Sequence, residues 1–314
     1  MRKWAWIAFW VLGLTWGSSF MLIRISVQEI NPFELVFIRV GIAAAGLLAL
    51  ARFQNIAIPS ERRVLIPLLL IGIGNPALPF LLISWGETVI HSSTASILQS
   101  TTSLFTLVIA HFFFEDERMS PQRVGGMTLG FIGVVILFSS NVDGGRVLLD
   151  SLLGQLAVVG ASLSYAVTVT YSKIQLKGKG VKPLAVATVS MISATVIMGI
   201  ATFAAPLLGG PSPVWLTDVS TGAAASAIVL GVFNTLFAYA IFYFVIGSLG
   251  AARASMVTYV VPVVGLILGI VFLGEPFTAN LFWGAVLIMA GIGFVNIPER
   301  FNIFSRARRE AVVK

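Results

Sequence analysis

The chain has 314 residues, of which 57% are hydrophobic and 11% are charged. Soluble globular proteins carry about 25% charged residues, so this composition excludes an ordinary soluble domain and indicates an integral membrane protein with little chain outside the bilayer. With no cysteine, the sequence excludes disulfides and cysteine-based metal centres, and with two histidines it gives no sign of another metal site or of a cofactor. The formal charge of +7 is typical of a membrane protein with basic cytoplasmic loops rather than of a nucleic-acid-binding protein.

Ten apolar runs, separated by charged or Pro- and Gly-rich breaks, predict an all-α protein with ten transmembrane helices. The first run follows Arg2 and Lys3, lacks a small-residue cleavage site and is long enough to span, so we interpret it as a helix rather than a signal peptide. In chain order the predicted helices cover residues 4–23, 34–51, 64–85, 93–114, 123–140, 151–172, 184–208, 221–246, 252–273 and 281–297.

The distribution of basic residues predicts the orientation. If the N-terminus is cytoplasmic, the cytoplasmic segments hold all of the 20 Lys and Arg residues except three. Two of these, Arg24 and Arg146, fall in outer loops, and Arg39 lies within a predicted helix. Because cytoplasmic loops of membrane proteins carry an excess of Lys and Arg, both termini are predicted to be cytoplasmic.

The two halves of the chain show weak internal similarity. A shift of 158 residues places Gly126 on Gly284, and a shift near 149 places Trp16 on Tyr165. Five helices in each half would insert the second half upside down, which is the inverted-repeat arrangement of secondary transporters with a substrate site near the bilayer midplane. The predicted organisation is a first five-helix repeat at 1–149, an inverted second repeat at 150–297 and a basic cytoplasmic tail at 298–314.

Several motifs carry a family resemblance. They are Trp16-Gly-Ser-Ser-Phe20, Asn31-Pro-Phe-Glu-Leu-Val-Phe-Ile-Arg39, Gly250-Ala-Ala-Arg-Ala-Ser-Met-Val-Thr-Tyr-Val-Val-Pro262 and Leu273-Gly-Glu-Pro276. With them the chain resembles, over residues 4–297, the EamA-type branch of the drug/metabolite transporter superfamily. The resemblance implies a ten-helix transporter of small metabolites in the bacterial inner membrane, frequently an exporter of amino acids or related compounds. The chain departs from the family pattern at Leu104, where many relatives have proline, and at Asp116-Glu117, which stands where the second half has Gly274-Glu275.

Polar residues within the predicted helices are the first candidates for substrate binding. Asn75 and Pro76 lie in a Gly- and Pro-rich stretch, where proline frees backbone carbonyls that only protein or a water-filled cavity can surround. Asn234 is the rough counterpart of Asn75 in the second half, and the alternative is that both asparagines only join neighbouring helices. Gln99 and Tyr259 lie on polar stripes that should face the bundle interior, because a polar stripe facing lipid is costly.

Aromatic residues form the second group of candidates. Trp16, Tyr165 and Tyr239 lie within the predicted helices and are expected to offer aromatic faces to a substrate. The alternative is a membrane-interface position, which is common for Trp and Tyr.

Arg39 lies about five residues into its predicted helix. A charge at that depth is costly, so Arg39 is expected to pair with Glu34, to extend to the outer surface, or to bind the carboxylate of a substrate. Glu87 and His91 are expected to be exposed charges of an outer loop. No predicted helix has a carboxylate in its central third, which favours facilitated diffusion or exchange over proton-driven transport.

These features predict a secondary transporter that moves a small metabolite by alternating access, and the family resemblance implies an exporter or exchanger of amino acids or similar compounds. The alternatives are a multidrug or organic-cation exporter of the same fold, a channel, or a non-transporting membrane receptor. Motifs of metalloproteases, serine hydrolases and ATP-driven proteins do not occur, so we do not expect an enzyme. The expected partners are a small-molecule substrate and the lipid bilayer, without nucleic acid, and the chain is expected to be a monomer or a homodimer.

Overall fold

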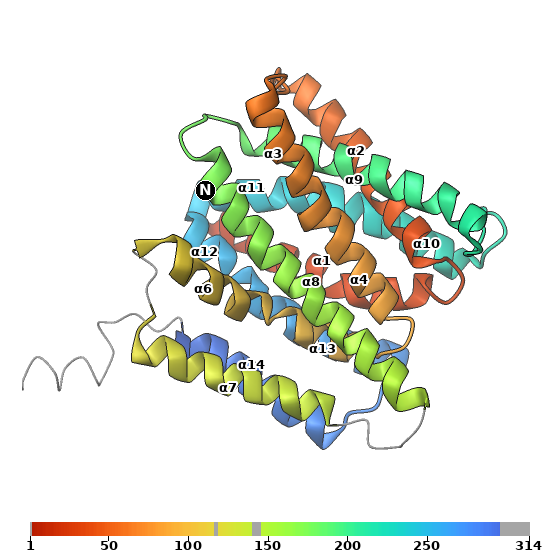
Figure 1. The fold of residues 1–314 in the computed structure, drawn as a ribbon, viewed down its shortest axis with the longest axis vertical. Coiled ribbons are helices and arrows are strands. Elements are labelled where there is room, and N and C mark those ends of the chain that lie inside the picture. Colours follow the sequence, from red (N-terminus) through yellow and green to blue (C-terminus); the bar gives the residue numbers. More distant parts are fainter. Residues whose placement is uncertain (1, 116–118, 140–145, 296–314) are drawn as a thin grey trace, which may run out of the picture.

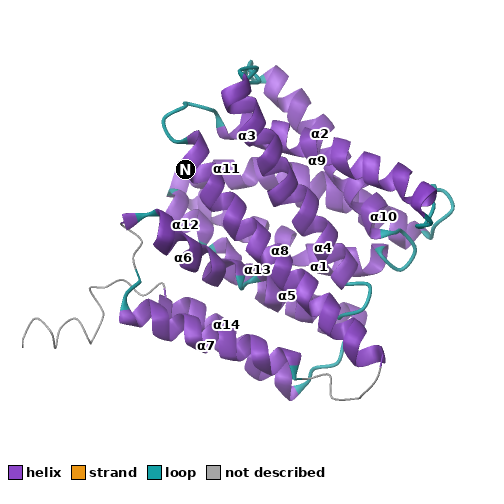
Figure 2. Cartoon of the chain, viewed as in Figure 1, coloured by secondary structure: helices purple, strands orange, loops and turns teal. Residues whose placement is uncertain are grey.

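The computed structural model describes residues 2–115, 119–139 and 146–295, and within these ranges it consists of helices and connecting loops without a strand (Figure 2). The longer helices are α1 (Arg2–Ser26), α2 (Pro32–Phe53), α3 (Arg62–Gly72), α6 (Thr102–Phe113), α7 (Pro121–Phe138), α8 (Arg146–Leu176), α9 (Pro183–Ala204), α10 (Thr221–Gly231), α11 (Ala238–Leu249), α13 (Val257–Leu273) and α14 (Ala279–Val295). Shorter helical segments are η1 (Ile73–Ala77), α4 (Leu78–Gly86), α5 (Ser92–Gln99), η3 (Ala205–Leu208), η4 (Val232–Phe237) and α12 (Ala251–Ser255).

Singly or joined end to end, these helical segments form stretches that are long and apolar enough to cross a bilayer. Nine candidate spans occur among the described residues: Lys3–Ser26, Pro32–Phe53, Arg62–Gly86, Ser92–Phe113, Pro121–Phe138, Leu149–Leu176, Pro183–Leu208, Thr221–Leu249 and Arg253–Leu273. The remaining predicted span corresponds to α14, which is equally apolar but shorter. The protein is therefore an all-helical integral membrane protein, and a tenth crossing by α14 stays a prediction.

Several predicted spans are interrupted in the structure. The span predicted at 64–85 contains the π-helical turn η1, and the one predicted at 221–246 contains a second π-helical turn, η4. In η1, Pro76 has no N–H to continue the α-helical ladder, which is a common cause of such a break. The span predicted at 93–114 is divided into α5 and α6 after Gln99.

The helices associate in pairs that are distant in sequence. Helix α7 packs along α14 at one edge of the molecule, and α2 packs along α9 at the opposite edge (Figure 1). Glycines permit the first contact, because a Cβ atom at Gly126 would lie 2.7 Å from the carbonyl oxygen of Gly291. Helix α1 contacts α10, α11 and α13, and α8 contacts α3, α4, α5 and α6. Since α8 begins at Arg146, the predicted boundary after residue 149 falls in its first turn, while the predicted tail at 298–314 lies outside the described residues.

One end of the bundle collects acidic side chains. It is formed by the connections 27–31, 87–91, 209–220 and 274–278, and we refer to it as the carboxylate end. Hydrogen bonds join these connections to one another and to the ends of neighbouring helices. In Figure 1 the 27–31 and 209–220 connections lie on the right, and the start of α1 lies on the left. The orientation predicted from the basic residues would place the carboxylate end on the outer side of the membrane.

Candidate functional site

The π-helical turn η1 contains one backbone carbonyl that is bonded to another helix and one side-chain amide, that of Asn75. The carbonyl oxygen of Gly74 accepts a hydrogen bond of 2.8 Å from Ser164 Oγ on α8. Pro76 is buried, and Asn75 is half-buried. The Asn75 amide makes no hydrogen bond with the residues that the structure describes, so it is available to a ligand.

Asn234 occupies the corresponding place in η4 but has a different environment. It is buried, and its Nδ2 donates to the carbonyl oxygen of Thr15 and to the hydroxyls of Ser18 and Ser19 at 3.0 and 3.1 Å, all on α1. The amide of Asn234 therefore joins two helices, which is the alternative that the sequence left open. The two asparagines share a position in their turns but not a role.

Arg39 is the charged group at the centre of the site. Its side chain is buried, with only 5% exposed, and its Nε donates to Thr235 Oγ1 of η4 at 2.8 Å. Its guanidinium carbon lies 3.8 Å from the centre of the Phe80 ring, in cation–π contact. Thr235 in turn donates to the carbonyl oxygen of Leu230 on α10 at 2.8 Å. The guanidinium is thus oriented by an aromatic ring and one hydroxyl rather than by an acidic partner.

The expected ion pair between Arg39 and Glu34 is wrong. Glu34 Oε2 instead accepts hydrogen bonds from Asn31 Nδ2 at 3.2 Å and from the Val214 backbone at 3.0 Å. Residues five apart on an α-helix point in directions that differ by about 140°, so the two side chains lie on different faces of α2. The glutamate joins the carboxylate end, and the arginine faces the interior.

Aromatic side chains lie near Arg39. Tyr165 on α8 and Tyr239 on α11 pack against the same apolar cluster as Phe80, whose ring contacts the guanidinium. The ring of Tyr239 lies 6.2 Å from that of Tyr243, the ring of Tyr243 lies 6.0 Å from that of Phe242, and the ring of Phe242 lies 5.3 Å from that of Trp16. The structure therefore brings Arg39, Tyr165 and Tyr239 together, and a continuous row of rings connects them to Trp16.

Gln99 and Tyr259 lie elsewhere around the same interior. Gln99 ends α5, and its Nε2 lies 3.2 Å from Thr102 Oγ1. Ser162 of α8 donates to the Gln99 carbonyl oxygen at 3.3 Å, which binds the break between α5 and α6 to α8. Tyr259 is half-buried and packs, like Tyr165, against the largest apolar cluster of the protein.

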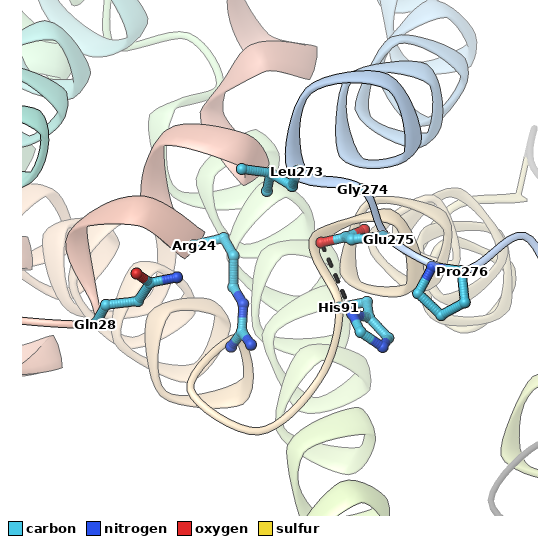
Figure 3. Close-up of a pocket in the computed structure, with 7 residues that line it drawn as sticks. All are labelled: Arg24, Gln28, His91, Leu273, Gly274, Glu275 and Pro276. Carbon is cyan, nitrogen blue, oxygen red and sulfur yellow. Dashed lines mark ion pairs between the residues drawn. The ribbon is translucent and has the colours of Figure 1, made fainter.

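A second polar cluster lies at the carboxylate end. Glu275, between α13 and α14, accepts hydrogen bonds from the backbone N–H groups of Ser92 and Ser93 at 2.7 and 2.9 Å and from Ser92 Oγ at 2.8 Å. Burial alone would raise the pKa of Glu275, but the hydrogen bonds from Ser93 and Ser92 outweigh it and hold this pKa below its ordinary value. Figure 3 shows Glu275 beside His91, whose Nδ1 lies 4.0 Å from Glu275 Oε1, in a pocket that Arg24 also lines.

The chain was compared with known proteins. The sequence model of one family, described as the EamA-like transporter family, matches two stretches of the chain, residues 3–139 and 152–297. The chain belongs to the EamA-like transporter family. The resemblance seen in the sequence motifs is thereby confirmed, and this transporter is a multi-pass protein of the bacterial inner membrane.

Relatives of this EamA-like transporter extend over its whole length. The uncharacterized transporter YoaV of Bacillus subtilis is 27% identical over 90% of this chain and 93% of its own length. A probable amino-acid metabolite efflux pump of Salmonella typhimurium is 27% identical over 94% of this chain and 95% of its own length. A protein of the same name from Escherichia coli is 26% identical over 95% of this chain and 94% of its own length. One crystal structure is similar to this chain with a TM-score of 0.64 and a sequence identity of 19%, which shows a shared fold. The match covers 94% of this chain and 97% of the chain in that structure.

The sequence did not point to every residue of the candidate site. Phe80, Thr235 and Ser164 were missed, since an isolated Phe, Thr or Ser in an apolar run has no pattern of its own. Thr235 directly follows Asn234, which the sequence had indicated as a candidate, and this adjacency was the one sequence feature that could have pointed to Thr235. Glu87, expected to be an exposed loop charge, is instead fully buried.

Proposed function

We propose that the protein is a secondary transporter that moves a small metabolite with a carboxylate group, of the amino-acid class, by alternating access as an exporter or exchanger. The observation that carries the proposal is the buried guanidinium of Arg39, which has a hydroxyl and a ring as its neighbours. A guanidinium binds a carboxylate in a planar, two-pronged geometry, and such a pair is strong in a site from which water is excluded.

The same observation argues against the organic-cation alternative. A cationic substrate would have to approach Arg39 against charge repulsion, whereas an amino acid offers its carboxylate to the arginine. Its ammonium group or side chain would then meet the aromatic row of Tyr239, Tyr243 and Trp16 through cation–π or apolar contact. Asn75, with its free amide, is the proposed hydrogen-bonding residue beside Pro76, and Tyr165, Gln99 and Tyr259 are proposed to complete the lining.

We also propose that the bundle is a ten-helix inverted repeat with both termini cytoplasmic. Under the predicted repeat, α1 corresponds to α8, α2 to α9 and α7 to α14. Helices α2 and α7 each pack on their own counterpart, while α1 and α8 each pack on the third and fourth helices of the opposite half. The π-helical turns in the third helix of each half, both with asparagine at the third position, support the same relation.

The names of two relatives support the substrate class. They are called probable amino-acid metabolite efflux pumps and align with nearly the entire chain. A carboxylate-binding arginine agrees with that class of compound.

The test compares transport of amino acids with transport of the corresponding amines, which lack the carboxylate, in proteoliposomes. The unaltered protein should take up one or more amino acids in a saturable way with counterflow, and should not take up the matched amine. Arg39→Met should lower that transport by at least about tenfold, because a lost charge-assisted hydrogen bond is worth about 1.5–3 kcal/mol. Arg39→Lys should retain part of it.

Thr235→Val is the matched control, because it removes the hydrogen-bond partner and keeps the guanidinium. If Thr235→Val loses transport as completely as Arg39→Met, Arg39 acts only through the structure of η4 and the carboxylate proposal fails. Flux without saturation or counterflow would indicate a channel. Equal transport of amino acid and amine would refute the substrate class.

A further inference from the structure

Glu87 is a carboxyl group with no hydrogen-bond partner in the interior of the carboxylate end. Its side chain has 0% exposure, and neither carboxyl oxygen makes a hydrogen bond with the described residues. Arg24 is directed at the same residue, but its Nη1 donates to the main-chain carbonyl oxygen of Glu87 rather than to the carboxylate. A buried carboxylate without hydrogen bonds is costly, whereas the neutral acid is much less so.

The charged groups around Glu87 come from three elements. Arg24 on α1 and Arg39 on α2 favour its charged form, and Glu275 in the connection after α13 opposes it. Helix α8 contributes Gly154 and Val158 next to Gly86, neither of which titrates. Burial raises the pKa of the Glu87 carboxyl well above its ordinary value, the nearby Glu275 charge raises this pKa further, and the charges of Arg24 and Arg39 lower it without reversing the shift.

We propose that Glu87 is a proton-binding site that controls the carboxylate end: it carries a proton while this end is closed, as in this structure, and releases it when the end opens to water. On closing, one proton from the adjacent water protonates the Glu87 carboxylate to the neutral acid. On opening, the same O–H bond breaks, and the proton returns to water.

A route for that proton lies next to the residue. Figure 3 shows the pocket lined by Arg24, Gln28, His91 and Glu275, with Arg24 reaching from α1 toward the loop between α4 and α5. Two of these lining residues, Arg24 and Glu275, are groups that interact electrostatically with Glu87. Separation of α1 or of the 274–278 connection from this loop would admit water to the carboxyl group.

The sign of the pH effect follows from linkage. The closed form binds the proton more tightly than an open form in which Glu87 is hydrated, so acid favours closing and base favours opening. Between the ordinary pKa of a glutamate, about 4.5, and the raised value in the closed form, the equilibrium constant for opening should rise by up to about tenfold per pH unit. Replacement of Glu87 by a residue that does not titrate should abolish this dependence.

The experiment uses the absence of cysteine from the chain. Ile90→Cys places a thiol in the same loop at a position that is 4% exposed, so reaction with a water-soluble maleimide reports opening. Labelling rates are measured on purified protein between pH 5 and 8, with Glu87 and with Glu87→Gln. Because both proteins carry the same thiol, the ratio of their rates cancels the thiol chemistry. We expect the ratio of the labelling rate with Glu87 to the labelling rate with Glu87→Gln to rise by up to about tenfold per pH unit and to level off at higher pH.

Two controls accompany this measurement. The exposed reporter Gln28→Cys should give a ratio that does not change with pH, and Asp218→Asn, which removes an exposed carboxylate of the same end, should leave the Ile90→Cys profile unchanged. A constant ratio for Ile90→Cys would overturn the proposal. If Glu87→Gln does not fold, the unaltered protein is examined by infrared spectroscopy, where a protonated carboxyl band at neutral pH that shifts in Glu87→Asp supports the proposal and its absence refutes it.

The inference rests on the proposed transport function only in assuming that the carboxylate end opens. No substrate is present in the labelling measurement. Loss of amino-acid selectivity in the Arg39 experiment would therefore leave the pH dependence standing, and a constant labelling ratio would leave the Arg39 result standing.

Discussion

Replacement of Glu275 should destabilise the closed carboxylate end. This carboxylate accepts three hydrogen bonds at the start of α5, where the N-cap residue His91 makes no side-chain capping bond of its own. It therefore serves as the cap of α5 from a distant part of the chain. A lost cap costs about 1 kcal/mol, and hydrogen bonds to a charged group are worth about 1.5–3 kcal/mol, so Glu275→Ala should lower the free energy of unfolding by about 2–4 kcal/mol.

Glu275→Gln should cost about half as much, because the amide oxygen still accepts a hydrogen bond without the charge. The lowered pKa of Glu275 means that its stabilising contribution is present above its unfolded pKa of about 4.5 and is lost as the pH falls through the folded value. The difference between the unaltered protein and Glu275→Gln should therefore be full at pH 7 and shrink below about pH 4.

The assay is thermal unfolding of the purified protein in detergent. The matched control is Glu61→Ala, since Glu61 is an exposed glutamate that precedes α3 without making a side-chain cap. Equal melting temperatures for Glu275→Ala, Glu61→Ala and the unaltered protein at pH 7 would refute the capping argument. If the difference in melting temperature between the unaltered protein and Glu275→Gln were as large at pH 3 as at pH 7, the role of the Glu275 charge would be refuted.

Three further predictions address packing, orientation and the π-helical turn. Gly126→Ala should destabilise the protein by about 1–3 kcal/mol in thermal unfolding, because the new Cβ would lie 2.7 Å from a backbone oxygen of α14, whereas Gly125→Ala, 3.7 Å from its nearest neighbour, should not; equal effects would contradict the packing. In whole cells, Gln28→Cys should react with an impermeant maleimide and Gln54→Cys should not, and the reverse pattern would invert the topology. Ser164→Ala should cost about 1–3 kcal/mol in the same unfolding assay by removing the donor to the Gly74 carbonyl oxygen of η1, and an unchanged melting temperature would contradict this role.

The sequence alone predicted the class of protein and most helix positions. Long apolar runs must be helical in a bilayer, because no water is available there to satisfy an open backbone. The breaks inside the helices were foreseen only where proline marked one, at Pro76. The second π-helical turn, η4, contains no proline, and the hydrogen bond from its Thr235 hydroxyl to the carbonyl oxygen of Leu230 is a contact that no local pattern reveals.

The surroundings of the candidate site residues were predicted only in part for the same reason. Arg39 was selected from its depth alone, but its neighbours Phe80 and Thr235 come from other helices and could not be assigned. Asn75 and Asn234 look alike in sequence, and only the contact of Asn234 with α1 separates their roles.

Hydropathy and charge determined by themselves that this chain is a helical membrane protein, since each residue meets the bilayer singly and its transfer free energy depends on its own type. The tertiary structure decided which charges are buried and which side chains meet. The sequence predicts Glu87 to be an exposed loop residue, but in the structure it is buried, with Arg24 of α1 and Glu275 of the connection after α13 nearby. Burial of a loop depends on packing between helices that are far apart in the chain, and a linear pattern does not contain that information.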